Sequence, residues 1–152
     1  MCIRDSNNID YQLDEIICGV GGKHIIYNAM MATINPGDEV IITAPFWVSY
    51  PDIVLLAEGN PVIVECPQSQ NFKITPEQLE KNINSKTKWL MLNSPSNPTG
   101  SVYSKKELED LAHILKKYPN VLIMCDDIYE KIVYDGVEFL SLIHISEPTR
   151  LV

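Results

Sequence analysis

The chain has 152 residues, of which 45% are hydrophobic, and a formal net charge of -8. This length and composition predict one globular domain with a real core. The acidic balance, with only 12 Lys plus Arg, argues against a nucleic-acid partner, which needs a basic surface. Because no apolar stretch approaches the roughly 20 residues of a membrane span, we expect no membrane partner and a cytoplasmic location.

Both ends of the chain are predicted to lie outside the fold. Residues 140–150 (LSLIHISEPTR) are the translation of a sequencing adapter used with a transposase, and residues 1–6 (MCIRDS) begin with the translation of its reverse complement. One DNA element in opposite orientations is hard to obtain by chance. Segments 1–6 and 140–152 are therefore interpreted as adapter-derived tails, and residues 7–139 as an internal piece of a longer protein.

Besides Cys2 in the first tail, the cysteines are Cys18, Cys66 and Cys125. They form no C-x-x-C pair, and two of them lie on apolar runs. We therefore expect buried, reduced thiols in a reducing compartment rather than metal ligands or a disulfide framework.

The first predicted unit is a strand, a glycine turn and a helix. Residues 15–18 form a short apolar run, glycines follow at 19 and 21–22, and residues 23–34 show the apolar spacing of a helix. Backbone N–H groups at such a helix start commonly hold a phosphate. Glycine pairs are a weak signal, so a phosphate cradle and a plain tight turn are both compatible with these residues.

Strands and helices alternate along the rest of the chain. Strands are predicted at 39–43, 62–64, 89–92 and 121–125, and helices at 50–58, from a cap at 75–78, and from a capping box at 104–107 to about 117. This alternation predicts an α/β fold, a mainly parallel sheet with helices on both faces.

Side chains suited to a planar ligand follow three of these strands. Trp47 follows the strand at 39–43, Asn97 lies in a proline-rich turn, and Asp126 and Tyr129 come at the end of the last strand. Open α/β sheets bind ligands at the carboxyl ends of their strands. The alternatives are that Trp47 is a core residue, that Asp126 is a cap or turn residue, and that the turn is an ordinary connection.

The proline-rich turn carries a family resemblance. Residues 94–100 read S-P-S-N-P-T-G, which resembles the S-P-x-N-P-T-G signature of class I aminotransferases, pyridoxal-phosphate enzymes of fold type I. Stretches similar to the aspartate aminotransferase branch stand around it in family order: GGK at 21–23, NPGDE at 35–39, PFWVSY at 45–50 and DDIYE at 126–130. The resemblance covers nearly all of residues 7–139, and it implies the large cofactor-binding domain of this fold, present in part.

The resemblance also implies roles for particular residues toward pyridoxal 5'-phosphate. His24 stands where the branch usually has glutamine, Asp127 stands where it has glutamate, and the Asn97-Pro98 bond is often cis in the family. The implied roles are phosphate binding by the backbone amides of Gly22 and Lys23, ring stacking by Trp47, pairing with the pyridine nitrogen by Asp126, and hydrogen bonding to the ring oxygen by Asn97 and Tyr129. Trp47 and Asn97 are also implied to contact the substrate.

The activity that follows from the resemblance belongs to a longer parent enzyme. That enzyme transfers an amino group between an amino acid, expected to be of the aspartate type, and a 2-oxo acid, and it acts as a homodimer in amino acid metabolism. In the family, the lysine that forms the internal imine and the arginines that bind substrate carboxylates lie well beyond the position of Tyr129. No residue of this chain is therefore nominated for catalysis, and we expect the chain as given not to transaminate.

Other functions could keep the same motifs. One is a different fold type I pyridoxal-phosphate enzyme, such as a C–S lyase. Another is the aminotransferase-like sensor domain of a transcriptional regulator. A nicotinamide-binding domain is least expected, because no G-x-G-x-x-G follows the first predicted strand.

Overall fold

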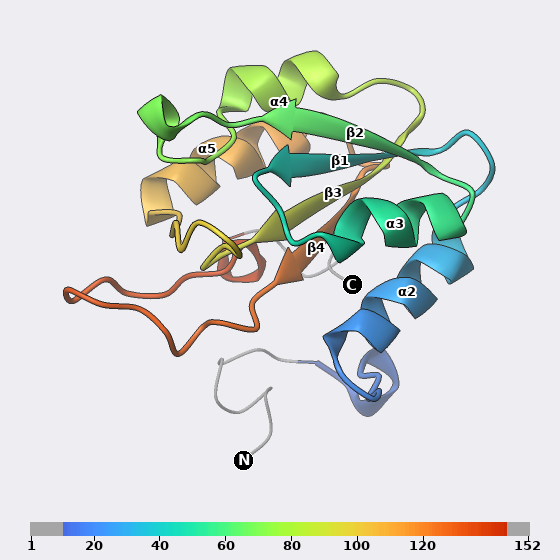
Figure 1. The fold of residues 1–152 in the computed structure, drawn as a ribbon, viewed down its shortest axis with the longest axis horizontal. Coiled ribbons are helices and arrows are strands. Elements are labelled where there is room, and N and C mark those ends of the chain that lie inside the picture. Colours follow the sequence, from blue (N-terminus) through green and yellow to red (C-terminus); the bar gives the residue numbers. More distant parts are fainter. Residues whose placement is uncertain (1–10, 146–152) are drawn as a thin grey trace.

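A four-stranded sheet, parallel throughout, forms the centre of the molecule in the computed structural model, which describes residues 11–145 (Figure 1). In spatial order the strands are β2 (Asn60–Glu65), β1 (Glu39–Ala44), β3 (Thr87–Asn93) and β4 (Leu122–Asp126). Every neighbouring pair is parallel. The predicted α/β class with a mainly parallel sheet is confirmed.

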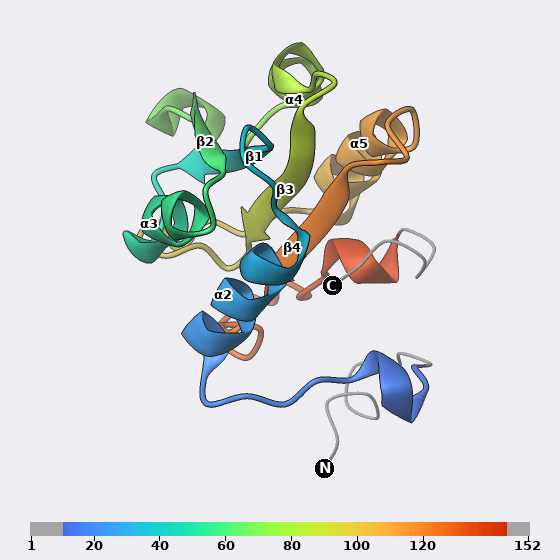
Figure 2. The ribbon, with the colours of Figure 1, turned by 90° about the vertical axis from the view of Figure 1, so that its right-hand side faces the viewer.

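One helix precedes the first strand, the other three connect successive strands, and together they cover both sides of the sheet (Figure 2). They are α2 (Gly22–Thr33), α3 (Ser49–Leu56), α4 (Pro76–Asn82) and α5 (Lys105–Leu115), with short 3-10 helices at Leu13–Glu15, Gln68–Gln70 and Leu142–His144. None of the helices in the described range has the length and apolar character needed to cross a bilayer.

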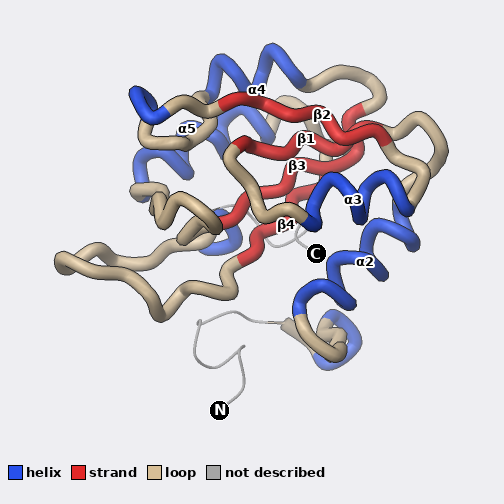
Figure 3. The backbone as a smooth tube through the Cα atoms, in the orientation of Figure 1, coloured by secondary structure: helices blue, strands red, loops and turns tan. Residues whose placement is uncertain are grey.

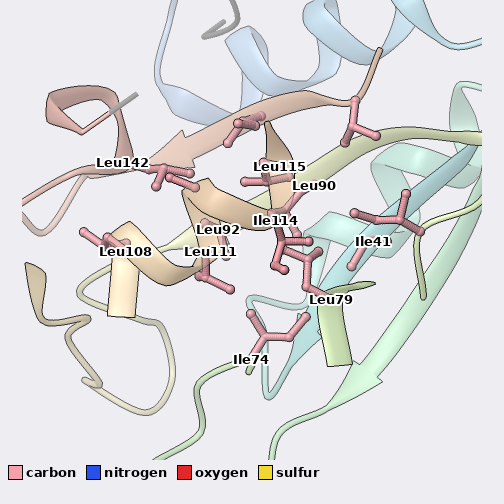
Figure 4. Packing of buried hydrophobic residues seen from close by; sticks show 14 of the residues in the cluster. Ile41, Ile74, Leu79, Leu90, Leu92, Leu108, Leu111, Ile114, Leu115 and Leu142 are labelled. Atoms are coloured by element: carbon pink, nitrogen blue, oxygen red, sulfur yellow. The ribbon is translucent and has the colours of Figure 1, made fainter. Parts of the chain in front are cut away.

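Strand alternation divides the buried residues into two cores. On β3, Trp89 and Met91 pack with residues of α2 and α3, whereas Leu90 and Leu92 pack with residues of α4 and α5. Successive strand residues point to opposite faces, so an apolar run such as that of β3 serves both sides at once. We call the two sides the α2–α3 face and the α4–α5 face; the buried side chains of the latter are drawn in Figure 4.

Two predicted helix starts are confirmed by their side-chain caps. At α4, the Gln78 N–H donates to Thr75 Oγ1 over 3.2 Å, and the Thr75 N–H donates to Gln78 Oε1 over 3.1 Å. At α5, Ser104 and Glu107 form the same reciprocal pair. Each pair satisfies two backbone donors that a helix start leaves without partners.

The strand predicted at residues 15–18 is wrong. Leu13–Glu15 forms a 3-10 helix, residues 16–19 have no regular structure, and the Ile17 side chain is 80% exposed. A strand needs a neighbour to accept its hydrogen bonds, and the described sheet places no strand beside this segment. Cys18 is expected to be buried in this strand, but it is exposed. The same lack of a neighbouring strand explains the difference.

The remaining cysteines follow the expectation more closely. Cys66 is buried, Cys125 is half-buried, and both thiols are free.

The helix predicted at 50–58 ends earlier, at Leu56. Glu58 has a left-handed backbone with φ 63°, through which a helix cannot continue.

The predicted tails fall only partly within the described residues. Residues 1–6, with Cys2, and residues 146–152 lie outside the described range. The prediction that the C-terminal end lies outside the fold is wrong for the part that is described, because Leu142 is 1% exposed and belongs to the core of the α4–α5 face (Figure 4). The adapter origin of both tails stays a prediction.

Candidate functional site

The connections that follow β1, β3 and β4 all leave the sheet at the carboxyl ends of parallel strands (Figure 3). The first leads through Trp47 into α3, the second is the proline-rich turn, and the third begins at Asp126. Because the strands run in the same direction, these connections share one edge of the sheet. This geometry places the predicted ligand-binding residues of three separate segments near one another.

A part-buried hydrogen bond joins α3 to the end of β4. The Tyr50 hydroxyl donates to Asp126 Oδ2 over 2.6 Å, and Tyr50 is 3% exposed. Burial, followed by the charge of Asp126, raises the pKa of Tyr50. The phenol therefore remains a donor throughout the physiological pH range and fixes one oxygen of the carboxylate. The other oxygen, Oδ1, accepts a long bond of 3.4 Å from the Ile128 N–H.

The side chain of Asn93 joins β4 to the proline-rich turn. Its Nδ2 donates to the carbonyl oxygen of Asp126 over 2.7 Å, and its Oδ1 accepts from the Asn97 N–H over 2.7 Å. One amide at the end of β3 thus sets the relative position of two residues that the sequence analysis selected. The Asn97-Pro98 bond is cis, as the resemblance implied.

Trp47 lies between Tyr50 and Lys23. Its ring meets the Tyr50 ring edge-on, with centroids 5.4 Å apart and an interplanar angle of 85°. The Lys23 ammonium lies 4.9 Å from the Trp47 ring centroid, within the range of a cation–π contact. Lys23 and Gly22 begin α2, where the preceding Gly21 has φ 82°, a conformation that favours glycine.

The structure therefore brings most of the predicted residues together through direct contacts. The contacts run from Lys23 through Trp47, Tyr50, Asp126 and Asn93 to Asn97. Tyr129 is half-buried one turn beyond Asp126, and its proximity contributes to the raised pKa of Tyr50. The roles of these residues toward a ligand stay predictions.

A small pocket opens on the same edge of the sheet. Its empty volume is about 210 Å³, part of which is open to solvent. The residues that line it are Ile42, Thr43, Pro45, Phe46, Tyr50, Met91, Asn93, Ser96 and Asn97. Asn97 is the predicted site residue that belongs to this lining. Trp47, Asp126 and Tyr129 stand outside its lining.

Sequence analysis missed two residues of this arrangement, Tyr50 and Asn93. Tyr50 stands in the PFWVSY stretch and Asn93 is the last residue of β3, so a local signal existed for each. Both bond to Asp126, which is 76 residues after Tyr50 and 33 residues after Asn93 in the sequence. Only the fold shows that these side chains meet.

The opposite face of the same edge has a different character. Asp127 lies in a second pocket that is also lined by Ser94, Cys125 and Ser141. Burial raises the pKa of Asp127 from its ordinary 3.8 to about 6, while a hydrogen bond with Ser141 opposes the rise. Burial likewise raises the pKa of the Cys125 thiol to about 12, so this thiol stays protonated.

Comparison with protein families and curated proteins adds independent information. The family model described as "Aminotransferase class I and II" matches residues 2–150. A probable aspartate/prephenate aminotransferase of Rickettsia typhi is 59% identical over 144 residues, which are 95% of this chain and 36% of that protein. The aspartate/prephenate aminotransferase of Nitrosomonas europaea is 51% identical over 138 residues, covering 91% of this chain and 35% of that protein.

Solved structures agree with these sequence matches. The aspartate aminotransferase of Rhizobium meliloti superposes with a TM-score of 0.94 at 46% identity, covering 97% of this chain and 38% of that one. The Thermus thermophilus aspartate aminotransferase with maleate gives a TM-score of 0.90 at 39% identity, with the same coverage of 97% and 38%. The chain spans about a third of the length of the curated relatives that it matches.

Proposed function

We propose, because this chain belongs to the class I and II aminotransferase family, that it is part of an enzyme that transfers an amino group between an amino acid and a 2-oxo acid. The continuous contacts from Lys23 to Asn97 carry this proposal. The names of the relatives support aspartate as the amino donor and prephenate as an acceptor.

The residues at this edge fit pyridoxal 5'-phosphate as the cofactor. An indole, a carboxylate with a partly open oxygen, and an amide are the groups that hold a flat, protonated pyridine ring with an oxygen substituent. Trp47, Asp126 and Asn97 provide them, and the donor Tyr50 keeps the carboxylate of Asp126 in place. When bound, this cofactor supplies an electrophilic carbon and a ring that accepts electrons.

Each residue would act by binding and orienting. Asp126 would hold the proton on the pyridine nitrogen through Oδ1, the oxygen that accepts only the 3.4 Å bond from Ile128. Trp47 would cover one ring face, and Asn97 and Tyr129 would bind the ring oxygen. The backbone amides of Gly22 and Lys23, at the exposed start of α2, would bind the phosphate.

The other functions considered above are not favoured. The relatives named above are all aminotransferases, whereas none is a C–S lyase or a regulator.

We place the parent enzyme in the cytoplasm as a homodimer. We further propose that residues 7–139 are part of its cofactor-binding domain and that the flanking residues derive from an adapter; genomic DNA encoding other residues beyond Phe139 would support this origin.

The binding of pyridoxamine 5'-phosphate tests the proposed cofactor. This compound is suitable because its amine cannot form imines with surface lysines. We expect Asp126→Asn to weaken binding, followed by calorimetric titration, by about tenfold or more, since a charge-assisted hydrogen bond to the ring is lost. Asp110→Asn, on α5, where the side chain is 42% exposed, is the control and should bind as the unmodified chain does. Equal affinity of the Asp126→Asn variant and the unmodified chain would contradict the proposal.

A further inference from the structure

The proline-rich turn is also held from the α4–α5 face. Its C-terminal leg, residues 101–103, is bonded to the segment that precedes α4. Ser101 Oγ donates to the carbonyl oxygen of Asn71 over 2.7 Å, and the Ile74 N–H donates to the hydroxyl of Tyr103 over 3.0 Å. Tyr103 is 4% exposed, so this contact lies within the core.

Lys73 lies at the centre of these contacts. Its side chain is only 15% exposed, and its Nζ lies 2.6 Å from Glu107 Oε1. The same ammonium donates to the Val102 carbonyl oxygen over 3.3 Å and lies 5.8 Å from the Tyr103 ring centroid. One cation therefore contacts the leg of the turn at two residues and the first turn of α5 at a third.

The ion pair of Lys73 and Glu107 is well suited to hold a fixed geometry. A largely buried ammonium is stable only when it is paired and hydrogen-bonded. Glu107 Oε2 also accepts from the N–H and the hydroxyl of Ser104, over 2.7 and 2.8 Å. Burial alone would raise the pKa of Glu107, but the bonds from Lys73 and Ser104 outweigh it and lower this pKa. The Glu107 carboxyl group is therefore ionised at neutral pH, as its contact with the Lys73 ammonium requires.

The leg is bonded in turn to the part of the loop that carries Asn97. The Ser96 N–H donates to the Ser101 carbonyl oxygen over 3.0 Å, and the Gly100 N–H donates to that of Ser96 over 2.7 Å. The Tyr103 N–H donates to Ser94 Oγ over 3.3 Å. A displacement of the leg would therefore move both ends of the turn.

We infer that Lys73 is a positioning residue: by holding the leg at Val102 and Tyr103 against Glu107, it fixes the turn that presents Asn97. The importance of Asn97 for a ligand rests on the proposed function. The contacts of Lys73 do not, because they are made within the chain. Asn93 holds the turn from the α2–α3 face and Lys73 from the α4–α5 face, so the turn is fixed from both sides of the sheet.

Hydrogen exchange of the Lys73→Met variant tests this role. Methionine keeps the apolar stem and removes the charge. The Ser96, Asn97 and Gly100 amides should exchange about tenfold faster, because bonds to a charged group are lost next to them, while the amides of β3 remain unchanged. Pyridoxamine 5'-phosphate should bind several-fold more weakly. Lys73→Arg, which keeps the charge, should recover most of the protection.

Lys117→Met is the matched control. Lys117 also pairs with a carboxylate of another helix, Glu80 on α4, at 2.8 Å, but its side chain is 48% exposed and lies beyond the last turn of α5. It should leave the exchange of the turn unchanged. Tyr103→Phe, which removes only the hydroxyl that Ile74 binds, should accelerate the same three amides as Lys73→Met does.

The outcomes separate this inference from the proposed cofactor. Unchanged exchange in the turn, or equal acceleration in the turn and in β3, would overturn the positioning role of Lys73. Failure of the unmodified chain to bind pyridoxamine 5'-phosphate would count against the proposed cofactor, and the exchange rates would still decide the role of Lys73.

Discussion

The two faces of the sheet end differently at the carboxyl edge of β3 and β4. On the α2–α3 face the last side chains are Asn93 and Asp126, which are joined to neighbouring segments by hydrogen bonds of 2.6 to 2.7 Å. One residue further along, on the α4–α5 face, Ser94 and Asp127 share a pocket with Ser141. Burial raises the pKa of Asp127 there to about 6.

The comparison shows that position on a strand decides what an aspartate can do. Asp126 and Asp127 are chemically identical neighbours, but strand alternation turns them to opposite sides. One oxygen of Asp126 accepts a short bond from the Tyr50 phenol and the other accepts only a long bond from the Ile128 N–H, whereas Asp127 lines a pocket together with core residues. The predictions below test whether the hydrogen-bonded face and the buried face respond to substitution as this difference requires.

The largest effect is expected at Asn93. Asn93→Ala leaves the Asp126 carbonyl oxygen and the Asn97 N–H without their partner. The free energy of unfolding in urea should fall by about 3 kcal/mol, since each unsatisfied group costs about 1 to 3 kcal/mol. Asn28→Ala, at an exposed position of α2, should change it by less than about 0.5 kcal/mol. If Asn93→Ala also changed the free energy of unfolding by less than about 0.5 kcal/mol, the hydrogen bonds of Asn93 would not hold this face together.

A smaller effect is expected at Tyr50. Tyr50→Phe keeps the edge contact with Trp47 but removes the hydrogen bond to Asp126. We expect a loss of about 2 kcal/mol in the free energy of unfolding, the magnitude of a bond to a charged group. Tyr134→Phe, where the side chain is 73% exposed, serves as the control and should be neutral. If both variants unfold at the same urea concentration, Tyr50 does not hold the carboxylate.

On the other face, the pH dependence of Asp127→Asn should be diagnostic. The pKa of Asp127 is raised in the folded chain, from 3.8 to about 6, so the folded state binds the proton more tightly. The contribution of Asp127 to the free energy of unfolding therefore falls as the pH rises from about 4 to about 6 and is level above that. At pH 7.5, Asp127→Asn should stabilise the chain by on the order of 1 kcal/mol.

The difference between the Asp127→Asn variant and the unmodified chain isolates the contribution of this carboxyl group. Its nearby charged neighbours Asp126, Glu130 and His144, which influence its pKa, are the same in both. Asp52→Asn, on the exposed side of α3, should show no such dependence. A variant whose stability curve parallels that of the unmodified chain from pH 4 to 7.5 would contradict the burial of Asp127.

The smallest effect is expected at a residue that belongs to neither face. Ile17 is 80% exposed and Ile41 is 0% exposed. Ile17→Val should therefore leave the free energy of unfolding within about 0.5 kcal/mol, whereas Ile41→Val should lower it by about 1 kcal/mol. Equal losses would mean that residues 16–19 are packed as β1 is.

Much of the fold was predictable because its signals are local. The Thr75/Gln78 and Ser104/Glu107 pairs mark helix starts within four residues, and apolar runs bounded by turn residues mark the four strands. The segment 15–18 shows the limit of this reasoning. Its apolar residues resemble a strand, but a strand also depends on a neighbour, and the neighbour is set by the whole fold.

The site was predictable to a lesser extent. Trp47, Asn97 and Asp126 could be selected because each stands at the end of a predicted strand and within a stretch that resembles the family; position after a strand alone left other interpretations open. Tyr50 and Asn93 could not be assigned, since their importance comes from hydrogen bonds to residues that are remote or turned to the same face only after folding. The contacts of Lys73 belong to the same class, because Val102 follows it by 29 residues in the sequence.

The central claim, that one ligand touches residues of three connections on the α2–α3 face, is tested most directly by NMR titration with pyridoxamine 5'-phosphate. We expect the Trp47 indole N–H and the amides of Asn97, Asp126 and Lys23 to shift together with one dissociation constant, while those of Cys125 and Ser141 stay in place. Inorganic phosphate should shift the amides of Gly22 and Lys23 and leave those of Asn97 and Asp126 in place. Shifts confined to the α4–α5 face, or separate dissociation constants for Trp47 and Asn97, would contradict the account.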